Sequence, residues 1–583
     1  MNPGPLKEDV LFLKKEHIAY AKFQKGDVEE LQFKQLRRGD KKLWTYLESI
    51  QMNDRLESII LRAGFGGILS CGFQPADNGL ITALAERWRP ETHTFHLPVG
   101  ETTITLQDIN VLFALPIEGD AISFGKFEMG IPQIYERVHN LLGFMPTPTD
   151  FKQGRKYLLK YTSIRSFLEN NILPPEPTQI QLNQHARCII LHILGSSLFN
   201  NTDNQGVNVQ FLDLLEDLDN CRRYSWGSAV LAFIYKSLCK AVISSERDLV
   251  GPMWMVQIWA WSRIKSLGPS IVLRRGQQHN FALPFASRYV NKLSFEDAPS
   301  HSARAIRATI QGLQHNDFEW LPYDNDMGRL TDSCTNGSTS WLCQCFLIFW
   351  EIAEFYDPTR VLRQFGITQN IPRNIQISKN EHKKLHETTK TGGSRTDWRH
   401  KHRSYIDSWN NRHNTRYLGT RINDAPTLEP GYLEWYRERT VTYIINPGVH
   451  HEGPPPYQDL AGMSQMMMDG MTQIREQGSQ LVGPGVPSEV PPEYLSGVEN
   501  MYNTAEQMLE YTGDWALSQY PSHFQTSPVD HGMNEFEPRR HRQRASHKGR
   551  GGTHDTAGAS GSRQYEQQDV FTQTTFDLNQ PPF

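Results

Sequence analysis

The chain has 583 residues, 38% of them hydrophobic, and a formal net charge of −4. It is long enough to bury a sizeable core, and it lacks the overall positive charge that would draw a protein to nucleic acid or membranes. Seven cysteines without the spacing of a disulfide framework are typical of a reducing compartment. Charged residues interrupt the N-terminal apolar runs, and later runs fall short of the roughly 18 residues of a membrane span. We therefore expect a soluble, intracellular protein with no membrane partner.

The first 55 residues mix charge with scattered apolar positions, and we predict only an arm of uncertain structure there. Residues 56–73 begin as a helix, and Gly64, Gly66 and Gly67 predict a helix stop and a tight turn. These glycines do not form a dinucleotide-binding fingerprint, because Leu69 stands where that pattern requires glycine and no strand precedes the run.

Residues 79–119 predict a helix, a β-hairpin and a second helix. Leu80, Leu84 and Trp88 recur at helical spacing before Pro90, which a helix cannot continue through. β-Branched and aromatic residues then alternate over residues 92–105 around a Pro-Val-Gly turn, which is typical of two paired strands.

The second helix of this segment has a clear predicted start. Thr105, followed three positions later by Asp108, predicts a capping box. The buried side of the helix is expected to carry Leu106, Ile109, Leu112 and Phe113, and Pro116 should close it.

Further helices are predicted along the chain from apolar periodicity. They cover residues 134–142, 156–169 and 182–199, two stretches within 208–242, and a helix that begins at Pro252. Ser225 is the expected cap of the second helix within 208–242. We interpret Trp254, Ile258 and Trp261 as core residues, because a tryptophan stripe at helical spacing usually packs inside the protein.

Two later segments bear on metal binding and order. Cys343 and Cys345 form a C-x-C pair rather than the usual C-x2-C zinc pair, so we place them as buried small residues on an apolar helix over residues 341–350. Residues 382–394 are polar and contain glycine, and we expect a mobile loop there.

The histidines of residues 79–119 invite a metal-site interpretation. His93 and His96 lie three positions apart on a predicted strand, where side chains alternate between faces. They should therefore point in opposite directions, and we predict no metal or cofactor site.

The acidic residues of the same segment invite a catalytic interpretation. Ion pairing with Arg87 and Arg89 in a polar network explains Glu86, Glu91, Glu101 and Asp108 as well. The alternative is an enzyme, in which Glu86, one of the two histidines and Asp108 would converge on a cleft. We favour the network and assign no catalytic residue.

Aromatic and basic side chains alternate over residues 398–416. The members of interest are Trp398, His400, His402, Trp409 and His413. A solvated basic face with inward-packed tryptophans is the favoured interpretation, and contacts with nucleic-acid phosphates or bases are the alternative.

The composition changes near residue 446, and we predict a largely disordered tail over residues 446–583. Residues 451–537 hold 13 acids against a single basic residue, Arg475, whereas the block 538–552 is basic. That block contains Arg539, Arg540, Arg542, Arg544, Lys548 and Arg550, which suit a nuclear localisation segment or a nonspecific nucleic-acid contact.

The chain ends in FDLNQPPF, in which Asp577, Leu578, Asn579 and Pro582 match the DLN-x-x-P repression motif of plants. Such peptides bind in a groove of Topless-type corepressors, and a leucine anchor on a free end suits this mode of capture.

Residues 79–122 closely resemble the signature of the aminotransferase-like plant mobile domain, the MAIN-like family of plant nuclear proteins and transposons. The matching positions are Glu86, Arg87, Trp88, Arg89, Pro90, His93, Phe95, His96, Leu97, Pro98 and Asp108. Later blocks, including WAWSRI, FEWLPY and YLEWYRERTVTYI, follow in the family's order. The resemblance covers residues 56–445 and extends to the non-catalytic domain of protein-phosphatase-7 long-form homologues.

The resemblance implies a nuclear factor in transposon and gene silencing, genome stability and meristem maintenance. It also implies nuclear protein partners, among them a protein-phosphatase-7-like phosphatase or other MAIN-like proteins. Some family members carry a fused metallophosphatase domain, but this chain lacks the metal-ligand segments of that chemistry. The alternative function is a transposon-derived nucleic-acid-binding protein.

Together these observations predict a mainly α (α+β) protein, with a multi-helical globular domain that contains a small β-hairpin insert. The predicted organisation is an arm over residues 1–55, the plant mobile domain over 56–445 and the disordered tail over 446–583.

Overall fold

The computed structural model describes residues 4–19, 35–36, 39–200, 205–243, 248–269, 283–289, 303–372, 377–386, 396–422, 426–442 and 444. The tail predicted over residues 446–583, with its basic block and its DLN-x-x-P end, lies outside the described residues.

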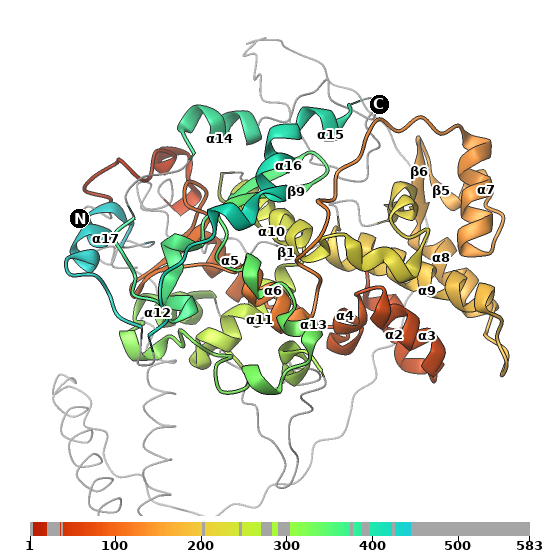
Figure 1. The fold of residues 1–583 in the computed structure, drawn as a ribbon, viewed down its shortest axis with the longest axis horizontal. Helices are drawn as coiled ribbons and strands as arrows, with labels where there is room; N and C mark the ends of the chain where they lie inside the picture. Colours follow the sequence, from red (N-terminus) through yellow and green to blue (C-terminus); the bar gives the residue numbers. More distant parts are fainter. Residues whose placement is uncertain are drawn as a thin grey trace, which may run out of the picture. The chain divides into compact units, whose positions relative to one another are not determined.

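Helices dominate the described part, and the strands form four small sheets (Figure 1). The α-helices are α2 (Lys41–Ser49), α3 (Asp54–Arg62), α4 (Gly66–Cys71), α5 (Asn78–Arg87), α6 (Leu106–Phe113), α7 (Ile131–Leu142), α8 (Tyr161–Asn170), α9 (Gln179–Ile193), α10 (Trp226–Ile243), α11 (Met253–Arg263), α12 (Ala303–Gln311), α13 (Asp332–Thr335), α14 (Lys379–His386), α15 (Trp398–Lys401), α16 (Arg403–Asn410) and α17 (Tyr432–Arg439). The predicted fold class is confirmed.

The strands pair mostly with neighbours in sequence. They are β1 (Gln35–Leu36), β2 (Trp88–Arg89), β3 (Thr94–Leu97), β4 (Gly100–Thr102), β5 (Phe151–Lys152), β6 (Arg155–Lys160), β7 (Gly206–Asn208), β8 (Asp248–Leu249), β9 (Cys345–Phe349) and β10 (Ile352–Tyr356). The sheets have the orders β1-β8, β10-β9, β2-β3-β4 and β5-β6-β7, and among the described strands only the β1–β8 pair is parallel.

Helix α10 lies at the centre of the described core, where it packs against α5, α6, β9 and β10 (Figure 1). Its sequence is apolar on every side, and a helix of that kind is stable in water only when other elements surround it. A second group of helices, in which α9 packs against α3, α7 and α8, continues the same hydrophobic core.

The helix–hairpin–helix prediction for residues 79–119 is confirmed, with one added strand. Asp77 caps α5 through the amide of Leu80, and Thr105 and Asp108 form the predicted capping box of α6. Leu97 faces Gly100 across the predicted hairpin turn, and β2 adds a third strand to the sheet. Helix α5 is buried on all its faces from Gly79 to Arg87, rather than along one stripe.

Two predictions of helix were wrong because strand pairing prevails over local periodicity. Within the helix predicted over residues 341–350, Cys345–Phe349 form β9 instead, which pairs along its whole length with β10 across a reversal at Trp350, whose φ is 50°. Cys343 and Cys345 are buried as predicted. Residues 156–160 belong to β6, which lies between β5 and β7, and the helix begins only at Tyr161.

Three smaller predictions were also wrong. The first helix expected within 208–242 is a pair of short 3-10 turns, Val209–Asp213 and Leu218–Arg223, and the Ser225 hydroxyl makes no cap hydrogen bond in the described structure. Residues 382–386, expected in a loop, complete α14, and the rest of that predicted loop, residues 387–394, lies outside the described residues.

The N-terminal segment is a packed part of the domain rather than a separate arm. Val10, Leu11 and Ala19 form a small hydrophobic cluster with Val441 and Ile444. His17 Nε2 lies 2.8 Å from the carbonyl oxygen of Trp88. The segment therefore joins the end of the domain to the signature hairpin.

Among the helices that the structure describes, none combines the length and the apolar character needed to cross a membrane.

Candidate functional site

Three acidic side chains of the signature are held in buried ion pairs. Glu86 accepts two hydrogen bonds from Arg307, at 2.8 and 2.9 Å, and Glu101 accepts two from Arg360, at 2.6 and 2.7 Å. Such bidentate pairs between a carboxylate and a guanidinium are the strongest of the charge-assisted hydrogen bonds.

Asp108 is the most enclosed of these acids. Its Oδ1 accepts hydrogen bonds from Arg263 Nη2 and from the Tyr323 hydroxyl, both at 2.7 Å, and its Oδ2 accepts one from the amide of Thr105 at 2.8 Å. The side chains of Asp108 and Arg263 have no exposed surface. Burial lowers the pKa of Arg263, but the attraction of Asp108 outweighs this effect and raises it.

The predicted polar network is present, and Arg89 attracts the buried Glu91 as expected, but the predicted partners of the other three acids were wrong. The expected arginines were Arg87 and Arg89, which are adjacent in sequence. Arg87 instead donates to the carbonyl oxygen of Thr442 and to the side chain of Gln311. Sequence proximity misled the prediction, because the arginines that pair with the acids come from α11, α12 and the segment after β10.

His93 and His96 have different surroundings, but His93 lies in the turn before β3 rather than on the strand where it was predicted. His96 Nδ1 lies 2.9 Å from the Thr440 hydroxyl, and burial together with nearby arginines lowers its pKa well below the usual value. His93 has a φ of 51°, which turns its ring away from the sheet and toward α10 and β10.

His93 thereby joins a buried cluster that no local sequence pattern marks. We define this His/Cys cluster as His93, Cys239 of α10, and His382 and His386 of α14. One potential metal-ligand atom from each of the four side chains lies within 4.8 Å of all the others. Glu354 of β10 adjoins the cluster, and its Oε2 lies 3.1 Å from Nε2 of both His93 and His386.

The charges around the cluster are strongly coupled. Burial lowers the pKa of His93, but Cys239 and Glu354 outweigh it and raise that pKa to about 10. Burial likewise raises the pKa of Glu354, but the adjacent histidines and Lys236 outweigh it and hold the pKa well below its usual value. Burial lowers the pKa of His382 to about 3. The site thus holds an ionised carboxylate paired with a protonated His93, and a neutral imidazole at His382.

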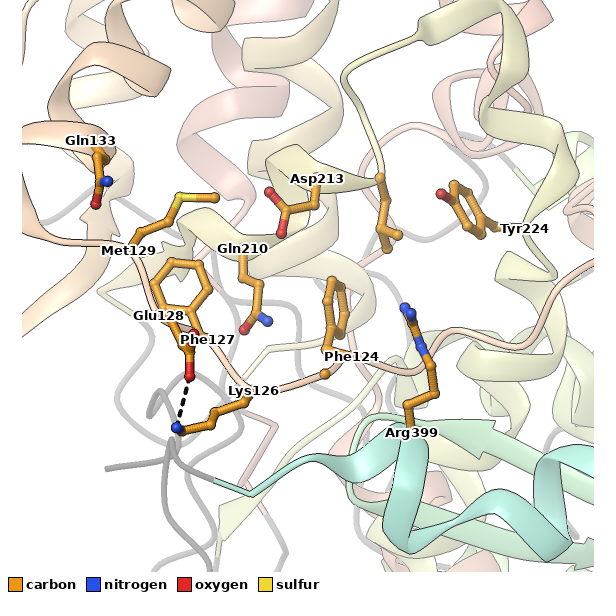
Figure 2. A pocket seen from close by; sticks show the side chains of 12 residues that line it. Phe124, Lys126, Phe127, Glu128, Met129, Gln133, Gln210, Asp213, Tyr224 and Arg399 are labelled. Atoms are coloured by element: carbon orange, nitrogen blue, oxygen red, sulfur yellow. Dashed lines mark ion pairs between the residues drawn. The ribbon is translucent and has the colours of Figure 1, made fainter.

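A surface pocket of about 500 Å³ lies elsewhere, along residues 124–129. Figure 2 shows Phe124, Asp213 and Arg399 around it, on three separate segments. Lys126 pairs with Glu128 at 2.7 Å, and Asp213 pairs with Arg137 at 2.9 Å. These acids are therefore paired with basic side chains. Acid–base catalysis instead requires unpaired titratable groups that converge on one cleft.

The aromatic and basic segment 398–416 agrees in part with the favoured interpretation, because Trp409 packs inward whereas Trp398 is only half-buried. Trp409 is fully buried and donates from Nε1 to the carbonyl oxygen of Gly119 at 2.9 Å. Arg412 is buried against Glu118, whereas Arg399, Lys401 and Arg403 are exposed. The tryptophan contributes to the core, and the exposed cations line α15 and α16.

The described part is therefore a mainly helical domain, whose signature acids form internal ion pairs and whose signature histidine enters a His/Cys cluster. A family model described as the plant mobile domain matches residues 64–437. The chain belongs to the plant mobile domain family.

Three relatives from Arabidopsis thaliana agree with this assignment. The chain is 32% identical to a "Serine/threonine-protein phosphatase 7 long form homolog" over 454 residues, which are 77% of this chain and 32% of that protein. It is 30% identical to Protein MAIN-LIKE 2, over 64% of this chain and 53% of that relative. It is 27% identical to Protein MAIN-LIKE 1, over 76% of this chain and 80% of that relative. The chain thus spans about a third and about half of the lengths of the first two relatives. No solved structure matches the chain.

Proposed function

We propose that this protein is a non-enzymatic nuclear scaffold that acts in transposon and gene silencing, genome stability and meristem maintenance. The observation that carries the proposal is the burial of the signature acids in ion pairs with Arg263, Arg307 and Arg360. These pairs fix distant segments to one another, so the signature supports a rigid binding platform.

The ion pairs also argue against the enzyme considered above. That hypothesis requires Glu86, Asp108 and a signature histidine to converge on a cleft. Glu86 binds Arg307 and Asp108 binds Arg263, so both carboxylates are already neutralised inside the protein. A buried carboxylate that is paired in this way has little capacity to take up a proton from a substrate.

In this proposal the domain and the tail have separate tasks. The helical domain binds a nuclear protein, either a protein-phosphatase-7-like phosphatase or another MAIN-like protein, and similarity to relatives with those names supports this choice. The basic block 538–552 directs nuclear entry, and the end 577–582 captures a Topless-type corepressor. Both sequences carry the chemistry for such peptide recognition.

Affinity purification from plant nuclei, followed by mass spectrometry, tests the scaffold. We expect phosphatase or MAIN-like partners with the wild-type chain, and loss of corepressor alone with Leu578→Ala. Gln580→Ala serves as the matched control at the same end. Unchanged corepressor capture by Leu578→Ala would remove the corepressor from the proposal, and recovery of no nuclear partner would remove the scaffold itself.

Replacement of Arg539, Arg540, Arg542 and Arg544 by alanine tests nuclear entry separately. A fluorescent fusion of this variant should shift from nucleus to cytoplasm, because import receptors recognise clustered positive charge. Replacing Arg399, Lys401, Arg403 and Arg416 by alanine provides a control that removes the same number of exposed positive charges within the domain. A variant that still accumulates in the nucleus would show that the block is not the import signal.

Nucleic-acid binding is the second candidate function, and the exposed cations of α15 and α16 favour it. If the domain binds DNA, affinity should fall steeply with added salt, because phosphate contacts release counterions. Lys401→Ala with Arg403→Ala should weaken binding and reduce the salt slope by about 2. Absence of binding by the wild-type chain at low salt would reject this function.

A further inference from the structure

We propose that the His/Cys cluster is a structural zinc site, with His93, Cys239, His382 and His386 as its ligands. In a tetrahedral zinc site with Zn–N near 2.1 Å and Zn–S near 2.3 Å, the ligand atoms lie about 3.5 Å apart. The four side chains already bring their ligand atoms within 4.8 Å of one another, so small rotations of the side chains complete the geometry.

His93 is held in the orientation and tautomer that a metal ligand requires. Its Nδ1 lies 2.8 Å from the carbonyl oxygen of Phe355, an acceptor only, so Nδ1 carries the hydrogen. A metal ion that replaces the proton on Nε2 would therefore bind a nitrogen that is already directed into the cluster. A backbone carbonyl bound to the second ring nitrogen is the usual support of a metal-ligating histidine.

Glu354 favours a positive charge next to the cluster. The Oε2 atom of Glu354 lies 3.1 Å from Nε2 of His93 and from Nε2 of His386. The carboxylate oxygen attracts a positive charge placed among the three groups, whether that charge is a proton on an imidazole or a metal ion that replaces the proton. Glu354 is then not one of the four ligands. It is a carboxylate outside the ligand set that accepts hydrogen bonds from the histidines or offsets the charge of the metal ion.

A buried nitrogen of His382 provides separate support for a metal ion in the cluster. It is 5% exposed, and its Nε2 makes no hydrogen bond in the described structure. Its ring stacks on His386 with centroids 4.1 Å apart, because the two residues lie four positions apart on one face of α14. A buried nitrogen without a partner is costly, and coordination to a metal satisfies it.

Cys239 offers the one sulfur ligand of the cluster. Its Sγ accepts a hydrogen bond from Trp88 Nε1 at 3.2 Å, so a signature residue supports it from outside the cluster. Three imidazoles and a thiolate form a donor set that Zn²⁺ favours. Because all four positions come from the protein and three of the residues are buried, the site is closed and structural rather than catalytic.

The zinc site also explains how α14 is attached. This helix has eight residues, KNEHKKLH, and only His382 among them is buried. A helix of this length is marginal on its own, and one buried side chain provides little apolar stabilisation. Two ligands from α14, together with one each from α10 and the hairpin, would fasten it to the core.

Elemental analysis of the full-length chain tests the proposal directly. The protein should be purified on a resin without chelated metal and dialysed against metal-free buffer. We expect about one zinc per chain, since structural sites hold zinc tightly enough to survive dialysis. Replacement by Co²⁺ should give a near-ultraviolet thiolate-to-metal absorption band. A folded wild-type chain that holds neither zinc nor added Co²⁺ would overturn the proposal.

Variants then assign the ligands. Cys239→Ser should abolish the thiolate-to-cobalt band, and His382→Gln should reduce zinc to about a tenth or less. Cys188→Ser and His192→Gln replace a buried cysteine and a buried histidine of α9, outside the cluster, and should leave both readouts unchanged. Circular dichroism checks that each variant is folded. If folded Cys239→Ser and His382→Gln retain the zinc and the band, the cluster is not the site.

Discussion

Asp108 is the residue at which the signature and two distant segments meet. Its two oxygens bind Arg263, Tyr323 and the N-terminus of α6, and none of its side chain is exposed. Replacing it by alanine would leave a buried guanidinium without its counter-charge, which is among the most costly single changes inside a protein.

We predict that Asp108→Ala lowers the free energy of unfolding by about 3 to 5 kcal/mol, as removal of one member of a buried ion pair does. Chemical denaturation followed by fluorescence provides the measurement. Glu128→Gln removes an exposed ion pair with Lys126 and should cause no measurable change. Equal effects of the two substitutions would contradict the structural role of Asp108.

His192 illustrates how a buried histidine couples stability to pH. It stacks on Tyr161, and its Nδ1 lies 2.9 Å from the Ser196 hydroxyl. Burial lowers its pKa from 6.5 to about 4, Asp40 opposes the shift and Arg165 adds to it. The unfolded chain therefore binds a proton at a higher pH than the folded chain does.

Stability should accordingly fall as the pH drops from 6.5 to 4, and this histidine accounts for a loss of up to about 3 kcal/mol. Below pH 4 both states are protonated, and the contribution levels off. Denaturation curves between pH 7 and 4 measure it, with His192→Gln as the comparison. A wild-type pH slope identical to that of the variant would show that His192 does not contribute.

At the scale of an element, the β3–β4 turn depends on Gly100. This residue has a φ of +125°, and a Cβ at this position would collide with the guanidinium of Arg363. Arg363 in turn donates from Nη2 to the carbonyl oxygen of Val99 at 2.6 Å, so the turn and the arginine are closely fitted.

Gly100→Ala should lower the free energy of unfolding by about 1 to 3 kcal/mol through backbone strain, with a further loss from the displaced arginine. Gly154→Ala is a matched control, because Gly154 also has a positive φ, +76°, but open space around it. Thermal unfolding should rank the Gly100 variant as the less stable. The reverse order would show that the contact with Arg363 is unimportant.

Individual helices and strands differ in how far their local sequence predicts them. Helix α6 and the β3–β4 turn carry their signals within a few residues, so both were predicted. β9 was not, because the run LCQCFLIFW is apolar without the alternation of a half-buried strand, and only pairing with β10 distinguishes it from a buried helix.

The candidate site was mostly beyond prediction for a related reason. His93 was noticed, but Cys239 and Glu354 lie on distant elements, and no local pattern relates them to it. The spacing of His382 and His386 was the one available signal. It was missed because a polar segment that contains glycine downstream favoured a loop, whereas the helix there places both histidines on one face.

At the scale of the whole domain, the N-terminal segment packs against the last described residues, around α17 and Val441. Besides the cluster of Val10 and Leu11 with Val441, Lys7 pairs with Glu438 at 2.6 Å and Asp9 with Arg439 at 3.0 Å. The boundary predicted at residue 55 therefore separates segments that pack together.

Deletion of residues 1–19 should lower the free energy of unfolding by about 4 kcal/mol. The deletion removes the buried side chains of Val10 and Leu11 and exposes the apolar surface that they cover. Thermal unfolding of the truncated and full chains measures this effect. Lys7→Ala alone, which removes only an exposed ion pair, should leave the melting temperature almost unchanged. A deletion variant as stable as the full chain would contradict the packed position of this segment.

The ion pairs of the signature impose an order of events during synthesis. Glu86 and its arginine are 221 positions apart, Asp108 and its arginine 155, and Glu101 and its arginine 259. At ribosomal speeds of 5 to 20 residues per second, Glu101 waits roughly 13 to 50 s before its partner is made. During that interval the carboxylates of the nascent signature lack these counter-charges, so its buried ion pairs are complete only after Arg360 has been synthesised.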